Sequence, residues 1–237
     1  MPKSVFLRLA GPLQSWAKPA VTGNYVNTSQ IPTVTALQGL IAGGLGFTRG
    51  NWPKWINDID FVIRQERQPN IVDDFQTIGS REDERRFRHR LALVQGMNSR
   101  SANPPTHKPG VAATTIAQRT YLADSEFIVQ LTLEGRTEEI DNAISSPVFV
   151  NYLGRKAFTP SFPYYLGVGD SDGLARIPTV QESLSPTSVK RANVFQYFLS
   201  MGADVSPTQV TVPAVENRAK WLESVEALGF KRHSTIV

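Results

Sequence analysis

The residues with the clearest chemical potential are arginines and lysines gathered in one part of the chain. Between Arg85 and Arg119 there are seven Lys or Arg residues and no Asp or Glu. The whole chain has 25 basic and 21 acidic side chains, so leaving out these seven bases changes the net charge from +4 to −3. Clustered cations bind polyanions because they release counterions from phosphates. The segment from Gly79 to Arg119 therefore predicts a phosphate-binding arm, with a solvated, disordered loop as the alternative.

Aromatic and cationic side chains outside this arm could recognise RNA bases. Proteins bind single-stranded RNA by stacking bases on aromatic rings or guanidinium planes and by placing cations near the backbone. Trp16, Tyr152, Arg155 and Lys156 carry groups of these kinds. For Trp16 the alternative is a ring that only covers an edge of the core.

The histidines could instead support a ribonuclease. Cleavage of RNA without a metal needs a general base near the 2′-hydroxyl and a cation for the phosphate. His107 with Lys108, or His89 with Tyr25, could take these roles, although a histidine on a loop can equally be a solvated side chain. The chain has three histidines and no cysteine, which excludes disulfides, thiolate metal sites and a cysteine nucleophile. We expect neither a metal nor a cofactor.

The composition is that of a folded protein with one or two domains, because 41% of the 237 residues are apolar and 19% are charged. The longest apolar stretch, residues 36–47, contains Gln38 and is well short of the roughly 20 residues that cross a bilayer. Arg8 interrupts the apolar run at the N-terminus, which argues against a signal peptide. We therefore expect a cytoplasmic protein that does not bind membranes.

Alternating and helical patterns predict the elements that position these residues. Alternating or apolar runs predict strands at Ser4–Ala10, Phe61–Arg64, Ile71–Ile78 and Phe127–Glu134, with the first strand covered on one face. Helical spacing predicts helices at Thr35–Leu45, Thr137–Ser145 and Glu216–Leu228. A loosely alternating β region, with a strand near Val194–Leu199, precedes the last helix.

The first predicted helix has two notable features. Thr35 and Gln38 have the spacing of a capping box, and the preceding Thr33 adds a hydroxyl to a helix start that could bind phosphate. Gly39, Gly43 and Gly44 each cost about 1 kcal/mol relative to alanine inside a helix, so they predict a close approach either to a sheet, which is the simpler cause, or to a bound backbone.

The basic arm has a period of two. Phe87, His89 and Leu91 alternate with Arg86, Arg88 and Arg90, which favours a hairpin over a helix. Residues 96–110 would form its tip and residues 111–119 its returning limb.

The order of elements predicts an α+β fold. It matches a ferredoxin-like or RNA-recognition-type domain over residues 1–150, with a long projecting β-hairpin inserted at about residues 79–119. Residues 151–237 would form a smaller C-terminal β-rich part with a terminal helix.

Three sequence blocks together resemble the CasD (Cas-five) family of CRISPR-associated proteins, and most closely its members in the type I-E Cascade surveillance complex. The blocks are Leu7–Trp16 (LRLAGPLQSW), Pro32-Thr33 leading into Gly39–Gly43, and Tyr152–Lys156 (YLGRK) followed by Tyr165–Gly167. The resemblance covers residues 5–170 in motif order. It implies an RNA-recognition-type domain with a thumb and a subunit that clamps the 5′ handle of the CRISPR RNA.

The resemblance also implies the binding residues and the partners. The RNA-binding residues would be Leu13, Gln14, Ser15, Trp16, Thr33, Thr35, Tyr152, Leu153, Gly154, Arg155 and Lys156, and the thumb would add Arg81, Arg85, Arg86, Arg88, Arg90, Lys108 and Arg119. The subunit would lie at one end of the backbone filament, against the backbone subunit and the large subunit that reads the protospacer-adjacent motif. Target DNA would be reached only through the complex.

The resemblance leaves two alternatives to an RNA clamp. Relatives in type I-C systems cut precursor RNA without a metal, but type I-E systems use a separate subunit for cleavage, which favours a non-catalytic protein. A structural adaptor would use its arm to bind protein instead of RNA. The salt dependence of binding separates that adaptor from a clamp.

Overall fold

The structure is a computed structural model that describes residues 2–16, 18, 25–78, 115–181, 189–198 and 203–232. Its strands are β1 (Lys3–Ala10), β2 (Leu13–Gln14), β3 (Tyr25–Val26), β4 (Asp60–Arg67), β5 (Asn70–Ile78), β6 (Thr115–Ala123), β7 (Glu126–Thr132), β8 (Tyr165–Asp170), β9 (Thr179–Val180), β10 (Val189–Phe198) and β11 (Ala203–Val215). Its helices are α1 (Val34–Gly44), the 3-10 helix η1 (Lys54–Asp58), α3 (Thr137–Ser145), α4 (Gly173–Arg176) and α5 (Arg218–Ala227). The predicted α+β class is confirmed.

The chain divides into two compact units. The larger comprises residues 1–17, 28–72 and 121–237, and the smaller comprises residues 18–27 and 73–120. Strands from both sides of residue 150 share one sheet in the larger unit. The domain boundary predicted near residue 150 stays a prediction.

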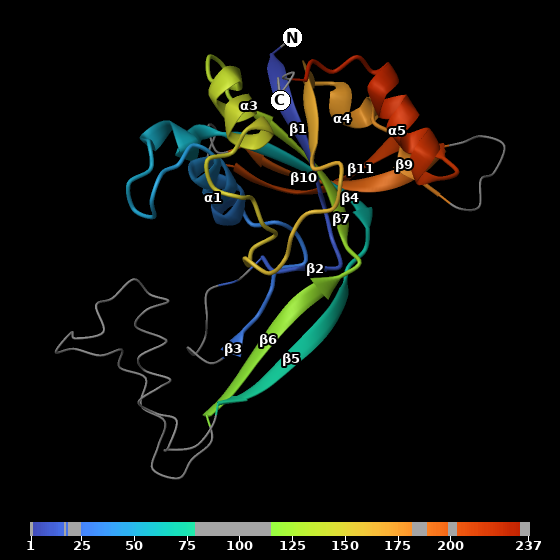
Figure 1. Cartoon of the computed structure of the whole chain (residues 1–237). Coiled ribbons are helices and arrows are strands. Elements are labelled where there is room, and N and C mark those ends of the chain that lie inside the picture. The colour runs from blue at the N-terminus through green and yellow to red at the C-terminus, as the bar shows by residue number, and fades with distance from the viewer. Residues whose placement is uncertain are drawn as a thin grey trace. The chain divides into compact units, whose positions relative to one another are not determined.

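A seven-stranded sheet organises the larger unit. Its strand order is β8-β1-β7-β4-β10-β11-β9, and every pairing is antiparallel except that of β11 with β9. The chain passes through α1 between β1 and β4, and through α3 between β7 and β8. Figure 1 shows α1 and α3 on one side of this sheet and α4 and α5 on the other.

Both faces of β1 are covered, which corrects the prediction of one covered face. Leu7 packs in the core beneath α1 and α3, whereas Phe6 packs with Trp221 and Val225 of α5. Phe6 also stacks on Phe230, with ring centroids 4.8 Å apart. The pattern of β1 could not reveal the second layer, because that layer comes from residues more than 200 positions away.

The start of α1 differs from the predicted capping box. Thr33 is the N-cap residue, with an extended backbone, and its hydroxyl makes no capping hydrogen bond. Gln38 is buried, and its Nε2 donates to the carbonyl of Ile56 at 3.4 Å. The N-cap therefore lies two residues before Thr35 and the helix begins at Val34, and Gln38 faces inward because it joins α1 to η1.

One glycine of α1 admits another helix and not the sheet. A Cβ at Gly44 would lie 2.0 Å from the carbonyl oxygen of Ala143 on α3, while a Cβ at Gly43 would meet nothing within 4 Å. The prediction of a close approach is confirmed for Gly44, but sheet packing as its cause is wrong.

The smaller unit contains the paired strands that flank the basic arm. β5 pairs with β6, and β3 runs parallel to β6 with Val26 opposite Arg119. The strand predicted at residues 71–78 is confirmed, and the returning limb predicted at residues 111–119 corresponds to β6, which runs from Thr115 to Ala123. The predicted tip, and the alternating segment that contains Arg86, lie outside the described residues.

Candidate nucleic-acid interface

The loop of residues 13–16 and the turn of residues 152–156 lie against each other in the larger unit. The backbone N–H of Ser15 donates to the carbonyl of Leu153 at 3.0 Å. The N–H of Leu153 donates to Phe158 O at 2.7 Å, and the N–H of Phe158 donates to Arg155 O at 2.8 Å, which closes the turn. The fold thus brings together two segments that are well over a hundred residues apart in the sequence.

Gly154 makes this approach possible. Its φ of +84° lies in the left-handed region, where residues with a Cβ are strained. A Cβ at Gly154 would also lie 1.6 Å from the carbonyl oxygen of Ser15. The glycine in the YLGRK block is therefore explained by backbone geometry, independently of any ligand.

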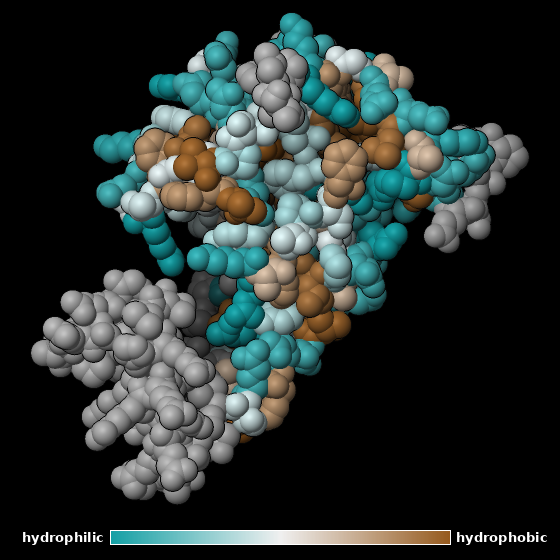
Figure 2. Space-filling view, viewed as in Figure 1, coloured by the Kyte–Doolittle hydropathy of each residue, from teal (hydrophilic) through white to brown (hydrophobic). Residues whose placement is uncertain are grey.

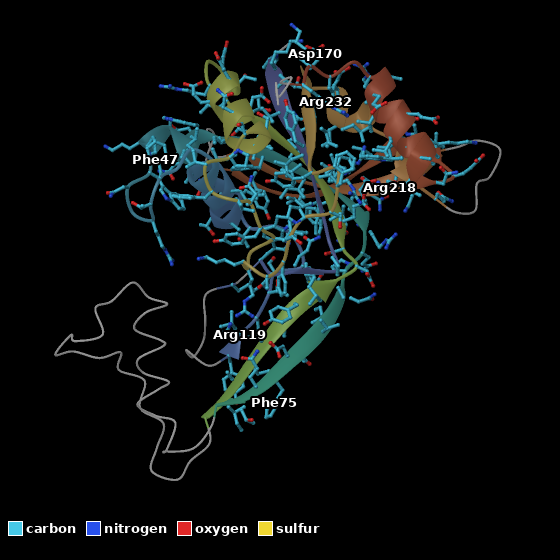
Figure 3. All side chains as sticks on the ribbon, in the orientation of Figure 1. Phe47, Phe75, Arg119, Asp170, Arg218 and Arg232 are labelled. Carbon is cyan, nitrogen blue, oxygen red and sulfur yellow. The ribbon has the colours of Figure 1, made fainter. Side chains whose placement is uncertain are left out.

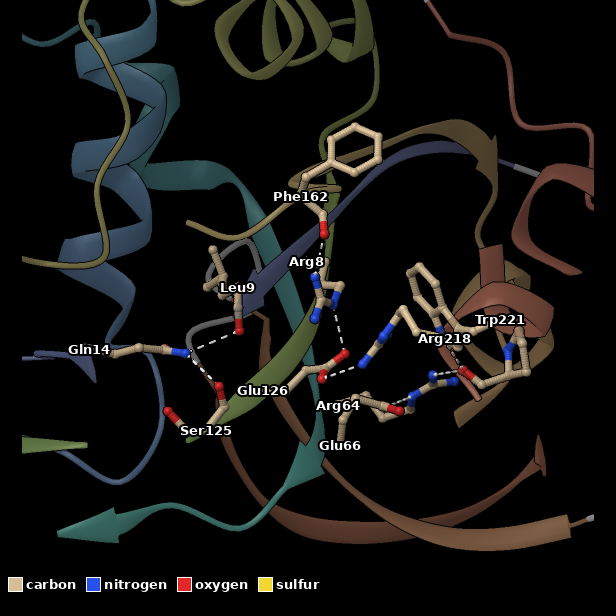
Figure 4. Close-up of polar contacts among 11 residues, drawn as sticks. Arg8, Leu9, Gln14, Arg64, Glu66, Ser125, Glu126, Phe162, Arg218 and Trp221 are labelled. Atoms are coloured by element: carbon tan, nitrogen blue, oxygen red, sulfur yellow. Dashed lines mark hydrogen bonds and ion pairs between the residues drawn. The ribbon is translucent and has the colours of Figure 1, made fainter. Parts of the chain in front are cut away.

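The side chains of Gln14 and Trp16 are buried and hydrogen-bonded. Both residues have 0% exposure. Gln14 Nε2 donates to Leu9 O at 3.2 Å and to Ser125 O at 2.8 Å (Figure 4). Gln14 Oε1 accepts a hydrogen bond from Trp16 Nε1 at 3.1 Å, and the backbone N–H of Trp16 donates to Thr28 Oγ1 at 2.8 Å. Trp16 offers no ring face to a base in this conformation and packs in the core, which agrees with the alternative predicted for it.

The neighbours of these two residues are also turned inward. Ser15 is 7% exposed, and Leu153 is fully buried in the core. Leu13 is half-buried, and on β2 it pairs with Ala123 of β6. In this group of predicted residues, the side chains support the loop and do not form a surface.

The turn of residues 152–156 presents its side chains to solvent. Tyr152 is 38% exposed, and Lys156 is also exposed. Arg155 is half-buried because its guanidinium lies over the ring of Tyr121, 5.3 Å from the centroid, and its Nη1 donates to the Tyr121 hydroxyl. The Tyr121 ring packs edge-on against Phe158, with centroids 5.0 Å apart. An aromatic ring, a guanidinium held in place and an ammonium group therefore stand on one short turn.

The two threonines at the start of α1 lie in different surroundings. Thr35 is exposed. Thr33 Oγ1 is buried and has no hydrogen-bond partner among the described residues. The helix start thus keeps an unused hydroxyl, and its role in binding phosphate stays a prediction.

The remaining predicted residues belong to the arm. Arg119 lies on β6 in the smaller unit, where it is half-buried (Figure 3). Tyr25, on β3 of the same unit, is 47% exposed. The other arm residues lie outside the described part of the chain: Arg81, Arg85, Arg86, Arg88, Arg90 and Lys108, together with His89 and His107.

Comparison with known families identifies the family of this chain. The family model described as CRISPR-associated protein (Cas_Cas5) matches residues 4–222, which include the loop of residues 13–16, the start of α1 and the turn of residues 152–156. The chain belongs to the Cas-five family of CRISPR-associated proteins. The resemblance expected from the three sequence blocks is confirmed.

Individual relatives of this Cas-five chain agree with the family match. The chain is 28% identical to "CRISPR system Cascade subunit CasD" of Escherichia coli (strain K12), over 69% of this chain and 70% of that protein. It has the fold of a chain in "CRISPR RNA-guided surveillance complex", with a TM-score of 0.71, 23% identity and coverage of 95% and 98% of the two chains. It also matches "Crystal structure of Cas protein", with a TM-score of 0.54, 20% identity and coverage of 89% and 95%.

A buried cluster of charged side chains in this Cas-five chain lies next to the anchor of the loop of residues 13–16. Glu126 accepts hydrogen bonds from Arg8 Nε and Arg218 Nη2, both at 2.7 Å, and the guanidinium of Arg218 lies 4.7 Å from the ring centroid of Trp221 (Figure 4). Burial alone would raise the pKa of Glu126, but the hydrogen bonds and charges of the two arginines hold it below its ordinary value. The cluster ties α5 to the start of β7, next to the Ser125 carbonyl that anchors Gln14.

Three site residues were missed by sequence reasoning. Tyr121 holds the Arg155 guanidinium and packs against Phe158, but Tyr121 stands 34 residues before Arg155, at no spacing that links the two in the sequence. Asn151 is buried directly before Tyr152, and its Nδ2 has no hydrogen-bond partner among the described residues. Only the adjacency of Asn151 to the YLGRK block could have marked it.

Two further properties bear on the site. No group of three or more His, Cys, Asp or Glu side chains in the described ranges is arranged to hold a metal ion. Among the helices of those ranges, none is both long enough and apolar enough to cross a membrane.

Proposed function

We propose that this Cas-five chain is a non-catalytic RNA-binding subunit of a Cascade-type complex, in which it clamps the 5′ handle of the CRISPR RNA. The observation that carries the proposal is the turn of residues 152–156, which presents Tyr152, Arg155 and Lys156 on one solvent-facing segment. Family membership supports it, because these residues stand in one of the blocks that resemble the family. The complex would work in the cytoplasm in defence against viruses.

The proposed chemistry divides the work between rings and cations. A splayed base would stack on Tyr152 or on the outer face of the Arg155 guanidinium. Lys156 would neutralise a backbone phosphate, and its ammonium group can follow that phosphate because its stem is flexible. Tyr121 would keep the guanidinium plane fixed before RNA arrives, which lowers the entropy lost on binding.

The loop of residues 13–16 would act as the support for this surface. Its buried hydrogen bonds fix the backbone of Ser15, and the hydrogen bond from Ser15 to Leu153 holds the turn against this fixed backbone. The start of α1 at Thr33 and Thr35 and the arm residue Arg119 would add phosphate contacts. The basic arm between Arg85 and Arg119 would hold the strand through charge.

A ferredoxin-like or RNA-recognition-type fold is part of the proposal. The order β8-β1-β7-β4, with α1 after β1 and α3 after β7, supports it, because such domains place their fourth, first, third and second strands side by side. The thumb would be the insertion between β5 and β6. The residues beyond about 150 would form the smaller C-terminal part.

The names of the relatives support a place in a complex of several subunits, and the resemblance to the family implies the particular partners. One relative is a Cascade subunit, and one matching chain belongs to an RNA-guided surveillance complex. We propose that this chain binds CRISPR RNA directly, lies against a backbone subunit and a large subunit that reads the protospacer-adjacent motif, and reaches target DNA only through them.

Binding and cleavage by the purified full chain test the proposal. A fluorescent RNA with the 5′ handle sequence would be titrated in EDTA, beside a scrambled RNA of the same composition, and both RNAs would then be examined on a denaturing gel. The proposal predicts that the intact handle RNA binds at least about tenfold more tightly than the scrambled RNA, a difference of about 1.4 kcal/mol. Equal affinity for the two RNAs would overturn the handle assignment, and site-specific cleavage lost in His107→Ala would make the chain a ribonuclease.

A further inference from the structure

A run of three apolar residues is exposed between α3 and β8. Val148, Phe149 and Val150 are 66%, 51% and 81% exposed, and Phe47, which follows α1, is 38% exposed. We call these four residues the VFV patch. In Figure 2 hydrophobic side chains gather over the ends of α1 and α3, and Figure 3 labels Phe47 on this side. Long exposed apolar runs are rare in proteins that do not use them for binding.

The backbone of the VFV patch is fixed by the end of α1. The N–H of Val148 donates to Gly44 O at 2.8 Å, and the N–H of Phe149 donates to Gly43 O at 3.3 Å. Gly46 has a φ of +82°, and a Cβ there would lie 3.1 Å from Val148 Cγ1. The backbone of the patch therefore satisfies the carbonyl of Gly44 and shares that of Gly43, which also accepts from Gly46 N at 3.0 Å, while its side chains are exposed. A partner would find these side chains already ordered, which lowers the entropic cost of binding.

The side-chain types of the patch favour a protein partner over RNA. Valine has no ring for base stacking and no charge for phosphate, which are the two means by which proteins hold single-stranded RNA. The centre of a protein interface, in contrast, is apolar and depleted in charge. Phe149 is suited to anchor such a centre, since buried aromatic residues dominate many interfaces.

The surroundings of the patch specify the partner further. Residues 39–57 and 142–169 contain no Asp or Glu, but they contain Arg49, Lys54, Arg155 and Lys156. Arg49, Lys54 and Lys156 are exposed. A partner with carboxylates around its own apolar centre would be complementary to these exposed cations, which neighbour the patch along the chain.

We propose that the VFV patch is the docking site for a protein subunit whose contact surface has an apolar centre and an acidic rim. This rests on the proposed function, which places the chain in a complex of several subunits. Val150 is two residues from Tyr152, so the docked protein would border the RNA-binding turn. Within residues 148–156, the patch would then contact a protein partner and the turn would contact the RNA.

Assembly of the full-length variant Val148→Ser/Phe149→Ser/Val150→Ser tests the proposal. Each of the two subunits proposed as neighbours, the backbone subunit and the large subunit from the same source, would be titrated separately onto the immobilised chain. For one of them we expect a loss of affinity of at least about tenfold, with affinity for handle RNA changed by less than about twofold. Val189→Ser, a valine 56% exposed on β10, is the matched control and should bind as the parent protein does.

Three results would overturn the proposal. Unchanged affinity for both subunits in the triple variant, with thermal unfolding as in the parent, would leave the patch without a protein partner. A tenfold loss of RNA affinity would assign the patch to RNA. A parent protein that forms dimers in light scattering, while the triple variant is monomeric, would assign the patch to a second copy. If the parent protein does not bind handle RNA but the triple variant still loses one subunit, only the proposed function fails.

Discussion

Trp16 and Tyr152 lie on two segments joined by the hydrogen bond from Ser15 to Leu153, yet their surroundings are opposite. Trp16 is 0% exposed and uses its indole N–H on Gln14, whereas Tyr152 is 38% exposed. The inner segment is therefore part of the core, and the outer segment is a surface held by that core. A contact surface for RNA needs both, because side chains that meet a ligand must be fixed by residues that do not meet it.

The comparison also separates two reasons for a residue to stand in a family-like block. Gly154 is explained by its left-handed backbone and the closeness of Ser15 O, and Gln14 by two buried carbonyls. Lys156, in contrast, is exposed, and nothing in the core accounts for it. Residues of the last kind are the ones to which a binding role is best assigned.

Paired substitutions at Trp16 and Tyr152 would have the largest effect. Trp16→Ala should lower the free energy of unfolding by about 3–5 kcal/mol, because it empties a fully buried site. Tyr152→Ala should change it by less than about 0.5 kcal/mol but weaken handle binding by about tenfold, the value of one stacked base. Urea unfolding and RNA titration check the pair. A Tyr152→Ala variant that binds RNA as tightly as the parent protein would contradict an RNA-binding role for the outer segment.

Gly154→Ala tests the junction between the two segments. We expect a loss of about 2–3 kcal/mol in unfolding free energy, from the left-handed backbone and from the clash with Ser15 O. Gly135→Ala is the matched control, since Gly135 also has a positive φ of +76° but a Cβ there meets nothing within 4 Å. Equal losses in the two variants would show that the approach of Ser15 is not what Gly154 accommodates.

Tyr121→Phe asks whether the guanidinium of Arg155 is positioned by its neighbour. The change keeps the ring and removes the hydroxyl that accepts from Arg155, so we expect a loss of about 1 kcal/mol in stability and a drop of roughly threefold in RNA affinity. The drop in affinity should vanish when Arg155 is already alanine. A full drop in that background would mean that Tyr121 acts on RNA independently of Arg155.

Lowering the pH should gradually destabilise the protein next to the inner segment, because Glu126 becomes protonated. Its pKa is lower folded than unfolded, so its contribution to stability is complete above the ordinary glutamate pKa near 4.5 and is lost as the pH falls through the folded value. Glu126→Gln should therefore flatten the decline in unfolding temperature between about pH 5 and pH 3. Glu134→Gln, at an exposed position, is the control. A decline as steep as in the parent protein would contradict this role.

Periodicity predicted much of the fold. The boundaries of α3 agree with the predicted Thr137–Ser145, and β7 and α5 begin within two residues of their predicted starts. The second covered face of β1 was not predictable, since Trp221 and Phe230 become its neighbours only through tertiary packing. The true cap of α1 was missed because Gln38 bonds to Ile56 and not to its own helix start.

The segments that form the candidate site could be predicted, but not which of their side chains are buried supports and which are exposed to a ligand. The resemblance singled out residues 13–16 and 152–156, and the fold joins them. Sequence could not show that Trp16 is turned inward, because a tryptophan in a polar loop fits a core edge and a stacking platform equally well. Nor could it show Tyr121, which reaches Arg155 from another strand.

The salt dependence of handle binding by Arg155→Ala/Lys156→Ala tests the central claim most directly. If each of these cations holds one phosphate, the slope of log affinity against log salt should be smaller in magnitude by about 1.4 than in the parent protein, from about 0.7 for each contact. Unfolding in urea should remain close to that of the parent. An unchanged slope in a folded double variant would contradict the claim that the turn of residues 152–156 binds RNA.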